Sequence, residues 1–223
     1  MKTRVSLLFI ATAFILLGCN GNSRKNATVE NDAVVESPSR EEIKNLSFSD
    51  LFTAIDVKEI PGDVFTLVSQ DFAILTAGNP SHYNSMVTGW GGWGILFSKP
   101  AVFSFLRSNR YTLELMRKEL KYTMTFFDDE FKEDIMKFGM SSGRDSDEKM
   151  KNTRLTAVQT LDSNMAFKEA KIIIECKLIE VTTVSPDDFY TEEGRKFIED
   201  AYAETNAYHK MVFGEITKVW IRK

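Results

Sequence analysis

Cysteine and histidine are scarce in this chain, and their scarcity limits the chemistry that its side chains can perform. Among 223 residues there are two cysteines, Cys19 and Cys176, and two histidines, His82 and His209. The histidines are too few and too scattered for a zinc site, so no metal is expected. Cys176 alternates with isoleucines, as a small buried hydrophobic residue on a strand does, and no catalytic thiol is indicated.

Basic residues are outnumbered by acidic ones, which argues against a nucleic-acid partner. Lysine and arginine total 28, aspartate and glutamate total 32, and the formal net charge is −4. An acidic surface repels a polyanion. A phosphate site in such a protein would be a local basic feature, which suits a small anionic cofactor better than a nucleic acid.

The N-terminus resembles a bacterial lipoprotein signal. Lys2 and Arg4 precede an apolar run at residues 5–17, which ends in Leu-Leu-Gly-Cys at Cys19. The run is short for a membrane span and has the charged start of an export signal, although an uncleaved anchor helix is the alternative. The resemblance implies lipidation of Cys19 after removal of residues 1–18, and attachment to a membrane of the bacterial cell envelope through the lipid only.

Two further segments follow the signal. Residues 19–45 are rich in Asn, Ser, Lys, Glu and Val without sustained apolar periodicity, which is typical of a flexible tether. Residues 46–223 contain no internal repeat or low-complexity tract and are long enough for one domain with a substantial core. We therefore expect a single folded domain on a lipid-attached tether.

The pattern of this domain is mainly β with helices. Apolar stretches predict strands at 72–77, 101–106, 122–127, 171–181 and 212–221, and helices are predicted at 112–118, 129–137 and 191–203. Within 171–181, Ile172, Ile174 and Cys176 alternate with Ile173 and Glu175, which predicts an antiparallel strand with one face in solvent. Because strands and helices do not alternate regularly, an α+β β-barrel is expected rather than a doubly wound sheet.

The segment from Asn84 to Thr112 carries the strongest functional signal. A Gly/Trp-rich stretch at 84–94, predicted as a loop, precedes an apolar strand and the basic hydroxyl cluster Arg-Ser-Asn-Arg-Tyr-Thr at 107–112. Glycines let a backbone approach a ligand closely, indoles offer flat walls, and arginines with hydroxyls bind anions. The order fits a flat ligand with a phosphate tail. The alternatives are a β-hairpin turn whose indoles fill a core or a dimer interface, and ordinary helix capping beside solvated arginines.

These motifs resemble those of the flavin reductase-like family, whose members are FMN-binding split barrels. The likeness continues at Ser-Gly-Arg-Asp (142–145) and at Tyr-His-Lys-Met-Val-Phe-Gly-Glu-Ile (208–216), and it covers roughly residues 60–223. It implies an FMN-binding split barrel that forms a homodimer, with one flavin in each subunit near the interface.

The resemblance also implies roles for single residues. The candidates for contact with FMN are Asn84, Ser85, Met86, Thr88, Trp90, Arg107, Ser108, Arg110, Tyr111, Thr112, Ser142, Gly143 and Arg144. His209 is a candidate on the substrate side of the flavin, with a structural histidine as the alternative. Lys149 is left out because Glu148 stands before it, where related sequences place an aspartate.

The sequence thus predicts an FMN-binding, flavin reductase-like oxidoreductase that transfers a hydride from NAD(P)H to flavin. No side chain is expected to be catalytic, because the flavin carries the chemistry. Two alternatives stay open: a non-enzymatic flavin carrier served by another electron donor, and a structural envelope lipoprotein without cofactor. An envelope location favours the alternatives, since nicotinamide cofactors are concentrated in the cytoplasm.

Overall fold

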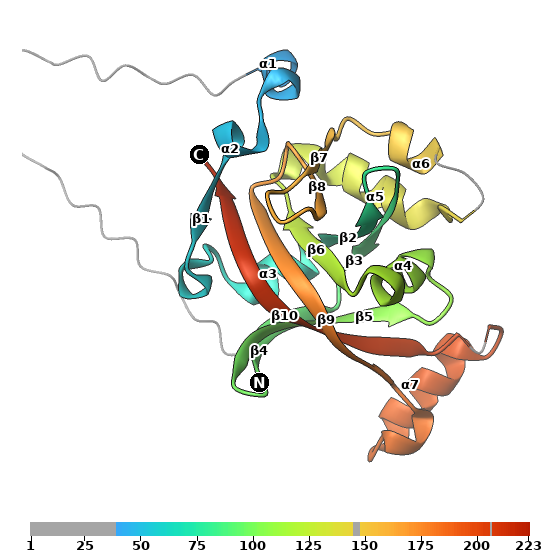
Figure 1. Cartoon of the computed structure of the whole chain (residues 1–223). Coiled ribbons are helices and arrows are strands. Elements are labelled where there is room, and N and C mark those ends of the chain that lie inside the picture. The colour runs from blue at the N-terminus through green and yellow to red at the C-terminus, as the bar shows by residue number, and fades with distance from the viewer. Residues whose placement is uncertain (1–38, 145–147, 206) are drawn as a thin grey trace, which may run out of the picture. The chain divides into compact units, whose positions relative to one another are not determined.

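Antiparallel strands form the centre of the fold (Figure 1). The computed structural model describes residues 39–144, 148–205 and 207–223. The main sheet has the order β3-β2-β6-β9-β10-β5-β4, with β1 paired to β10, and β7 and β8 form a separate pair. The strands are β1 (Phe52–Ile55), β2 (Ala73–Asn79), β3 (His82–Thr88), β4 (Gly91–Leu96), β5 (Lys99–Arg107), β6 (Lys121–Phe126), β7 (Ala157–Gln159), β8 (Met165–Phe167), β9 (Ile172–Thr183) and β10 (His209–Arg222).

Short helices surround this sheet. They are α1 (Arg40–Asn45), α2 (Phe48–Leu51), α3 (Val64–Ser69), α4 (Tyr111–Glu119), α5 (Lys132–Met140), α6 (Glu148–Lys151) and α7 (Glu192–Tyr202), with 3-10 turns at Val57–Glu59, Asp129–Phe131 and Pro186–Asp188. Helices α4 and α5 pack against β2 and β3, whereas α7 projects from the barrel between β9 and β10 (Figure 1). In the part of the chain that the structure describes, no helix has the length and apolar character needed to cross a bilayer.

The two end strands of the sheet, β3 and β4, are consecutive in the chain, and only residues 89 and 90 separate them. The backbone N–H of Phe105 donates to the carbonyl of Trp90 over 3.2 Å, and the Thr88 hydroxyl donates to the Phe105 carbonyl over 3.5 Å. These bonds hold the end of β3 against β5 and bring the sheet round into a barrel. A barrel closed in this way protects most strand edges by pairing them.

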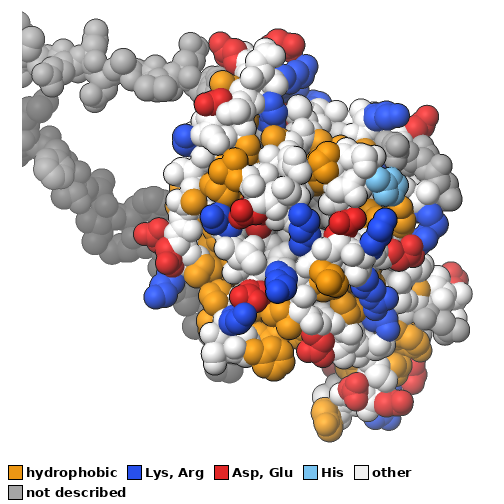
Figure 2. Space-filling view, in the orientation of Figure 1, with side chains coloured by type: hydrophobic (Ala, Val, Ile, Leu, Met, Phe, Trp, Pro, Cys, Tyr) orange, Lys and Arg blue, Asp and Glu red, His pale blue; other side chains and the backbone are white. Residues whose placement is uncertain are grey.

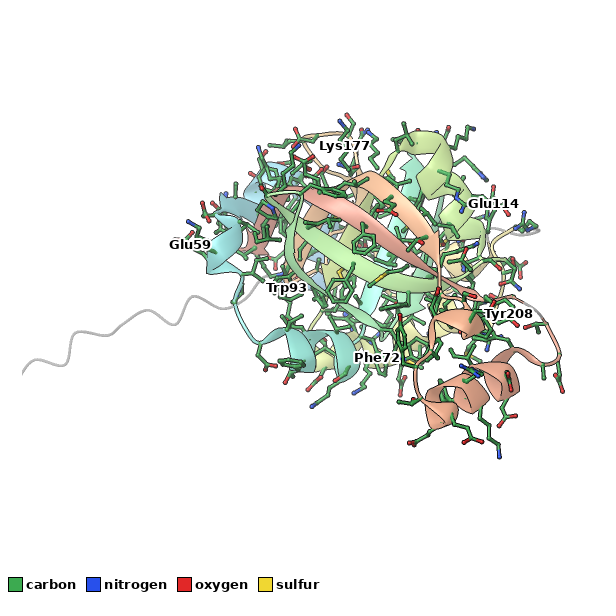
Figure 3. All side chains as sticks on the ribbon, turned by 90° about the horizontal axis from the view of Figure 1, so that it is seen from below. Glu59, Phe72, Trp93, Glu114, Lys177 and Tyr208 are labelled. Carbon is green, nitrogen blue, oxygen red and sulfur yellow. The ribbon has the colours of Figure 1, made fainter. Side chains whose placement is uncertain are left out.

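The apolar core lies on both faces of the sheet. Leu75, Met124 and Ile174 belong to the cluster inside the barrel, which is covered at one end by α4. On the outer face, Ile173 packs in a second cluster with Phe167 and other residues from α2, α5 and β8. Trp93 on β4, labelled in Figure 3, packs against the inner cluster. Its ring and that of Phe126 are 6.1 Å apart between centroids, at an interplanar angle of 70°.

The outer cluster overturns one expectation. Ile173 and Glu175 were expected in solvent, yet both are fully buried. The β7–β8 pair and the N-terminal helices cover this half of β9, and the Glu175 carboxylate accepts a hydrogen bond of 2.5 Å from the Trp220 indole. A buried carboxylate with such partners is satisfied. Cys176 on the other face is buried as expected, and burial raises the pKa of its thiol.

The predicted elements agree with the structure at β2, β5, β6, β9, β10, α4, α5 and α7. The predicted loop at 84–94 is wrong, because most of it is strand: β3, a two-residue turn and β4. The glycines made these strands difficult to predict, because glycine is generally depleted in strands. The folded unit also begins earlier than expected. Residues 40–45, assigned to the tether, form α1, whose Ile43 is buried and whose N-terminus is capped by Ser39.

Candidate functional site

A cavity of about 530 Å³ lies beside β3, between the N-terminus of α4 and the segment that follows α5. Seven of the sequence candidates line it: Asn84, Met86, Arg110, Tyr111, Thr112, Ser142 and Gly143. Residues 84 and 112 come from different elements, and residues 142 and 143 from a third. The fold thus brings the predicted contacts of the loop, of the basic cluster and of the Ser-Gly-Arg motif to one place, in a volume typical of a cofactor pocket.

Asn84 and Thr112 form the floor of this cavity. The Asn84 side-chain amide donates to the Thr112 hydroxyl over 2.7 Å, and both residues are at most 2% exposed. The Asn84 Oδ1 atom is buried and has no hydrogen-bond partner among the described residues. An unsatisfied buried acceptor costs about 1–3 kcal/mol, so a small shift of the Asn84 side chain that lets a ligand hydroxyl group reach this atom would be favoured.

The N-terminus of α4 opens into the same cavity. Arg110 occupies the N-cap position, and its side chain makes no capping hydrogen bond. The first backbone N–H groups of a helix then lack partners within the helix and carry partial positive charge. With the Arg110 guanidinium beside them, these N–H groups form the kind of donor set that binds phosphate.

Lys149 on α6 supplies a second cation that sequence reasoning left out. Its side chain is 9% exposed, and its ammonium donates to the carbonyl of Ser141 over 3.2 Å. Burial, and then the charge of Arg110, lower the pKa of Lys149 to about 8. The insertion of Glu148 before this lysine does not remove it from the site, because Lys149 lines the cavity. Its position soon after the Ser-Gly-Arg motif was the available signal.

Gly143 lies directly against Asn84. A Cβ atom at residue 143 would overlap the Asn84 side-chain oxygen, so only glycine fits here without movement. Ser142 stands beside it and accepts a hydrogen bond of 3.2 Å from the backbone N–H of Arg144. Residues 142 and 143 are therefore at the cavity as expected, and their backbone is within reach of a ligand.

Arg144 does not line the cavity. Its guanidinium forms a two-pronged ion pair with Glu114 on α4 and lies over the Tyr111 ring, 5.1 Å from the centroid. Hydrogen bonds from Arg144 lower the pKa of Glu114. Arg144 thus ties the segment after α5 to α4.

A smaller compartment of about 170 Å³ adjoins the cavity. Both contain Met86 and Arg110 in their walls, and the smaller one is completed by four further sequence candidates: Thr88, Trp90, Arg107 and His209. The basic cluster at 107–112 is therefore divided. Arg107 faces the smaller compartment, Tyr111 and Thr112 face the larger one, and Arg110 stands between the two.

His209 is held on two sides. Its Nδ1 atom is hydrogen-bonded to the Tyr202 hydroxyl of α7, and its ring lies 4.8 Å from the Trp90 indole at an interplanar angle of 37°. Burial, and then the charges of Arg107 and Arg110, lower the pKa of His209 to about 4. The imidazole is therefore neutral near pH 7, with one nitrogen bonded to Tyr202.

Two further candidates, besides Arg144, lie outside both cavities. Ser85 is fully buried, and its hydroxyl is 2.8 Å from that of Thr76 on β2, because alternate residues of β3 face opposite sides. Ser108 lines neither space, and its backbone N–H donates to the Tyr208 carbonyl. Cys19 lies outside the described residues. Within those residues, no group of three or more histidine, cysteine or acidic side chains could hold a metal ion.

Comparison with known proteins identifies the family. The family described as flavin reductase like domain matches residues 65–223. This chain belongs to that family. The match spans both cavities and all the strands from β2 to β10. No curated protein matches the chain by sequence.

Solved structures of the flavin reductase like fold share the architecture. The FMN-binding domain of a flavin reductases-like enzyme from Shewanella baltica has a TM-score of 0.54 at 13% identity, and 76% of each chain is covered. An FMN-binding protein from Thermus thermophilus, with bound 1-cyclohex-2-enone, has a TM-score of 0.52 at 16% identity, covering 75% of this chain and 80% of that one. A putative flavin reductase with a split barrel domain from Shewanella frigidimarina has a TM-score of 0.52 at 16% identity, covering 82% and 78%. The expected split barrel is confirmed.

Proposed function

We propose that this protein is an FMN-binding oxidoreductase of the flavin reductase type, with the cofactor in the 530 Å³ cavity. The observation that carries the proposal is the donor set there: Arg110, Lys149 and the uncapped N-terminus of α4, together with the partnerless acceptor Asn84 Oδ1. Cations and free N–H groups suit a phosphate, and the acceptor suits a hydroxyl. Similar solved structures include FMN-binding proteins, which supports the same choice of ligand.

Different residues of the cavity would bind different parts of FMN. Arg110, Lys149 and Thr112 would hold the phosphate end, and Asn84 would accept a hydrogen bond from the hydroxyl-bearing linker. Met86, Val87 and Met136 would provide an apolar surface for the ring system. When bound, FMN supplies the hydride chemistry, and the protein binds and orients it and restricts the access of water.

We further propose that NADH or NADPH is the electron donor. Support comes from family membership. No acid–base side chain is required, and the neutral His209 is suited to contact a substrate by hydrogen bonding rather than by charge.

The test is the visible absorbance of the purified protein, expressed from Asn26 and examined before and after anaerobic addition of NADH or NADPH. A flavin spectrum that bleaches rapidly is expected. A flavin that stays oxidised would contradict nicotinamide as donor and leave a flavin carrier. A colourless protein that does not bind added FMN would overturn the cofactor proposal.

Attachment through Cys19 and assembly as a homodimer complete the proposal. The lipoprotein-like signal supports a location in the bacterial cell envelope. The exposed Ile95 and Phe97 on the β4–β5 hairpin, 74% and 70% accessible, support a further contact surface. Incorporation of a labelled fatty acid that is lost in Cys19→Ala would support the anchor, and a monomer mass by light scattering would contradict the dimer.

A further inference from the structure

The smaller compartment has the size of a one-ring site. Its volume is about 170 Å³. An engineered protein cavity of about 150 Å³ holds one benzene molecule, so this space accepts a single six-membered ring with a small substituent. The three fused rings of a flavin exceed it. The compartment is therefore suited to a separate molecule that meets the larger cavity at Met86 and Arg110.

Aromatic side chains form its walls. The Trp90 indole is 51% exposed and stands near Phe105, with centroids 6.5 Å apart at 74°. The His209 imidazole also lies near this indole, with centroids 4.8 Å apart at 37°. Flat rings favour planar ligands, which can stack or pack edge-to-face against them. The shape thus selects a planar molecule.

The charge of the compartment is positive throughout. Arg107 and Arg110 line it, and none of the described residues around it is acidic. Among the residues for which the structure gives positions, neither guanidinium lies within ion-pair distance of a carboxylate. Arg107 instead lies over the Tyr202 ring, 5.5 Å from its centroid. Guanidinium groups without a carboxylate partner favour an anion, and their planar fork can bind both oxygens of a carboxylate.

His209 adds a third donor. Because its pKa is about 4, the ring is neutral at pH 7. When the Tyr202 hydroxyl donates to Nδ1, the ring hydrogen resides on Nε2. An N–H group that lines the compartment can then donate to an oxygen of the ligand.

We propose that the smaller compartment is a second substrate site that binds a planar, one-ring aromatic carboxylate between Trp90 and the guanidinium group of Arg107. As a substrate site this assignment rests on the proposed function, because it needs a cofactor in the adjoining cavity. The binding of the carboxylate itself does not.

The probe is benzoate, with benzamide as the neutral compound of the same shape. Both are titrated by calorimetry into the protein expressed from Asn26, with and without saturating FMN. We expect benzoate to bind at least about tenfold more tightly than benzamide, as a charge-assisted contact implies. Arg107→Gln should weaken benzoate about tenfold, and Trp90→Ala should weaken both compounds. Arg117→Gln, an exposed arginine of α4 that lines neither space, is the matched control.

Three results would overturn the site. They are equal affinity for the two probes, unchanged benzoate affinity in Arg107→Gln, and displacement of benzoate by FMN, which would mean one shared site. FMN binding is followed separately by absorbance in the same samples. Selective benzoate binding in a protein that does not take up FMN would overturn the proposed cofactor and leave the anion site standing.

Discussion

Asn84 on β3 and Gly143 after α5 pack so closely that residue 143 has no room for a side chain. The contact joins two segments that are far apart in the sequence. It also fixes the position of the buried Asn84 Oδ1 atom, which has no hydrogen-bond partner among the described residues. Two parts of the proposed cofactor site therefore depend on each other.

Gly143→Ala should weaken FMN binding. The new methyl group must displace the Asn84 side chain, and such overpacking costs about 1–3 kcal/mol, which corresponds to roughly 5- to 150-fold in affinity. Fluorescence titration of FMN measures the loss. Gly94→Ala is the matched control, because its Cβ would meet no atom within 4 Å. If Gly143→Ala binds FMN as tightly as the unsubstituted protein, FMN binding does not depend on the observed position of the Asn84 side chain.

FMN affinity should fall as the pH rises from 7 to 9.5. Burial lowers the pKa of Lys149 to about 8, so its ammonium loses its charge in this range and a bound phosphate loses a partner. Lys149→Arg should keep its affinity over the same range, since arginine stays charged. Equilibrium dialysis at several pH values separates the two. A parallel decline in both proteins would assign the effect to another group.

Arg110→Ala should reduce FMN affinity at least about tenfold, whereas Arg144→Ala should reduce it less than about threefold. Arg110 lines the cavity, and the guanidinium of Arg144 is engaged with Glu114. Absorbance titration of both variants, with thermal melts to verify folding, provides the comparison. Equal losses would mean that Arg144 also reaches the ligand.

His209 should make the folded state acid-sensitive. Its folded pKa of about 4 lies below the ordinary value of 6.5, so between these values the unfolded chain binds a proton that the folded chain does not. This group therefore lowers stability as the pH falls from 6.5 toward 4. Arg107→Gln removes a nearby positive charge and should raise the pKa of His209, as followed by NMR titration, while Arg117→Gln should not. An unchanged titration in Arg107→Gln would contradict the charge effect.

Periodicity predicted the elements whose apolar residues are unambiguous. The alternation of β9 was visible, but the burial of Ile173 and Glu175 was not, because it depends on a distant hairpin and on Trp220 from the end of the chain. The strands β3 and β4 were not predicted because the glycines at 84–94 are untypical of strands. Their pairing with β2 and β5 is visible only in the structure.

The sequence predicted the site as a set of separate motifs, and only the fold shows how their residues contact one another. Asn84 and Thr112 were named from separate motifs, and only the structure shows their hydrogen bond. Ser85 was named with its neighbours, yet strand alternation turns it away from them. Arg144 pairs with Glu114, and Lys149 lines the cavity. Both contacts join residues that are distant in the sequence, so no single motif could predict them.

Helix α7 lies in an excursion between two strands that are already paired with each other. Strands β9 and β10 are paired up to Thr183 and Lys210, where the segment that contains α7 leaves and rejoins the sheet, and Tyr202 of α7 contacts His209. Replacement of the segment that contains α7 by one of another length would leave the cofactor cavity intact. It would alter only the side of the smaller compartment that His209 lines. Choice of substrate can therefore diverge in this protein while the binding of its cofactor is conserved.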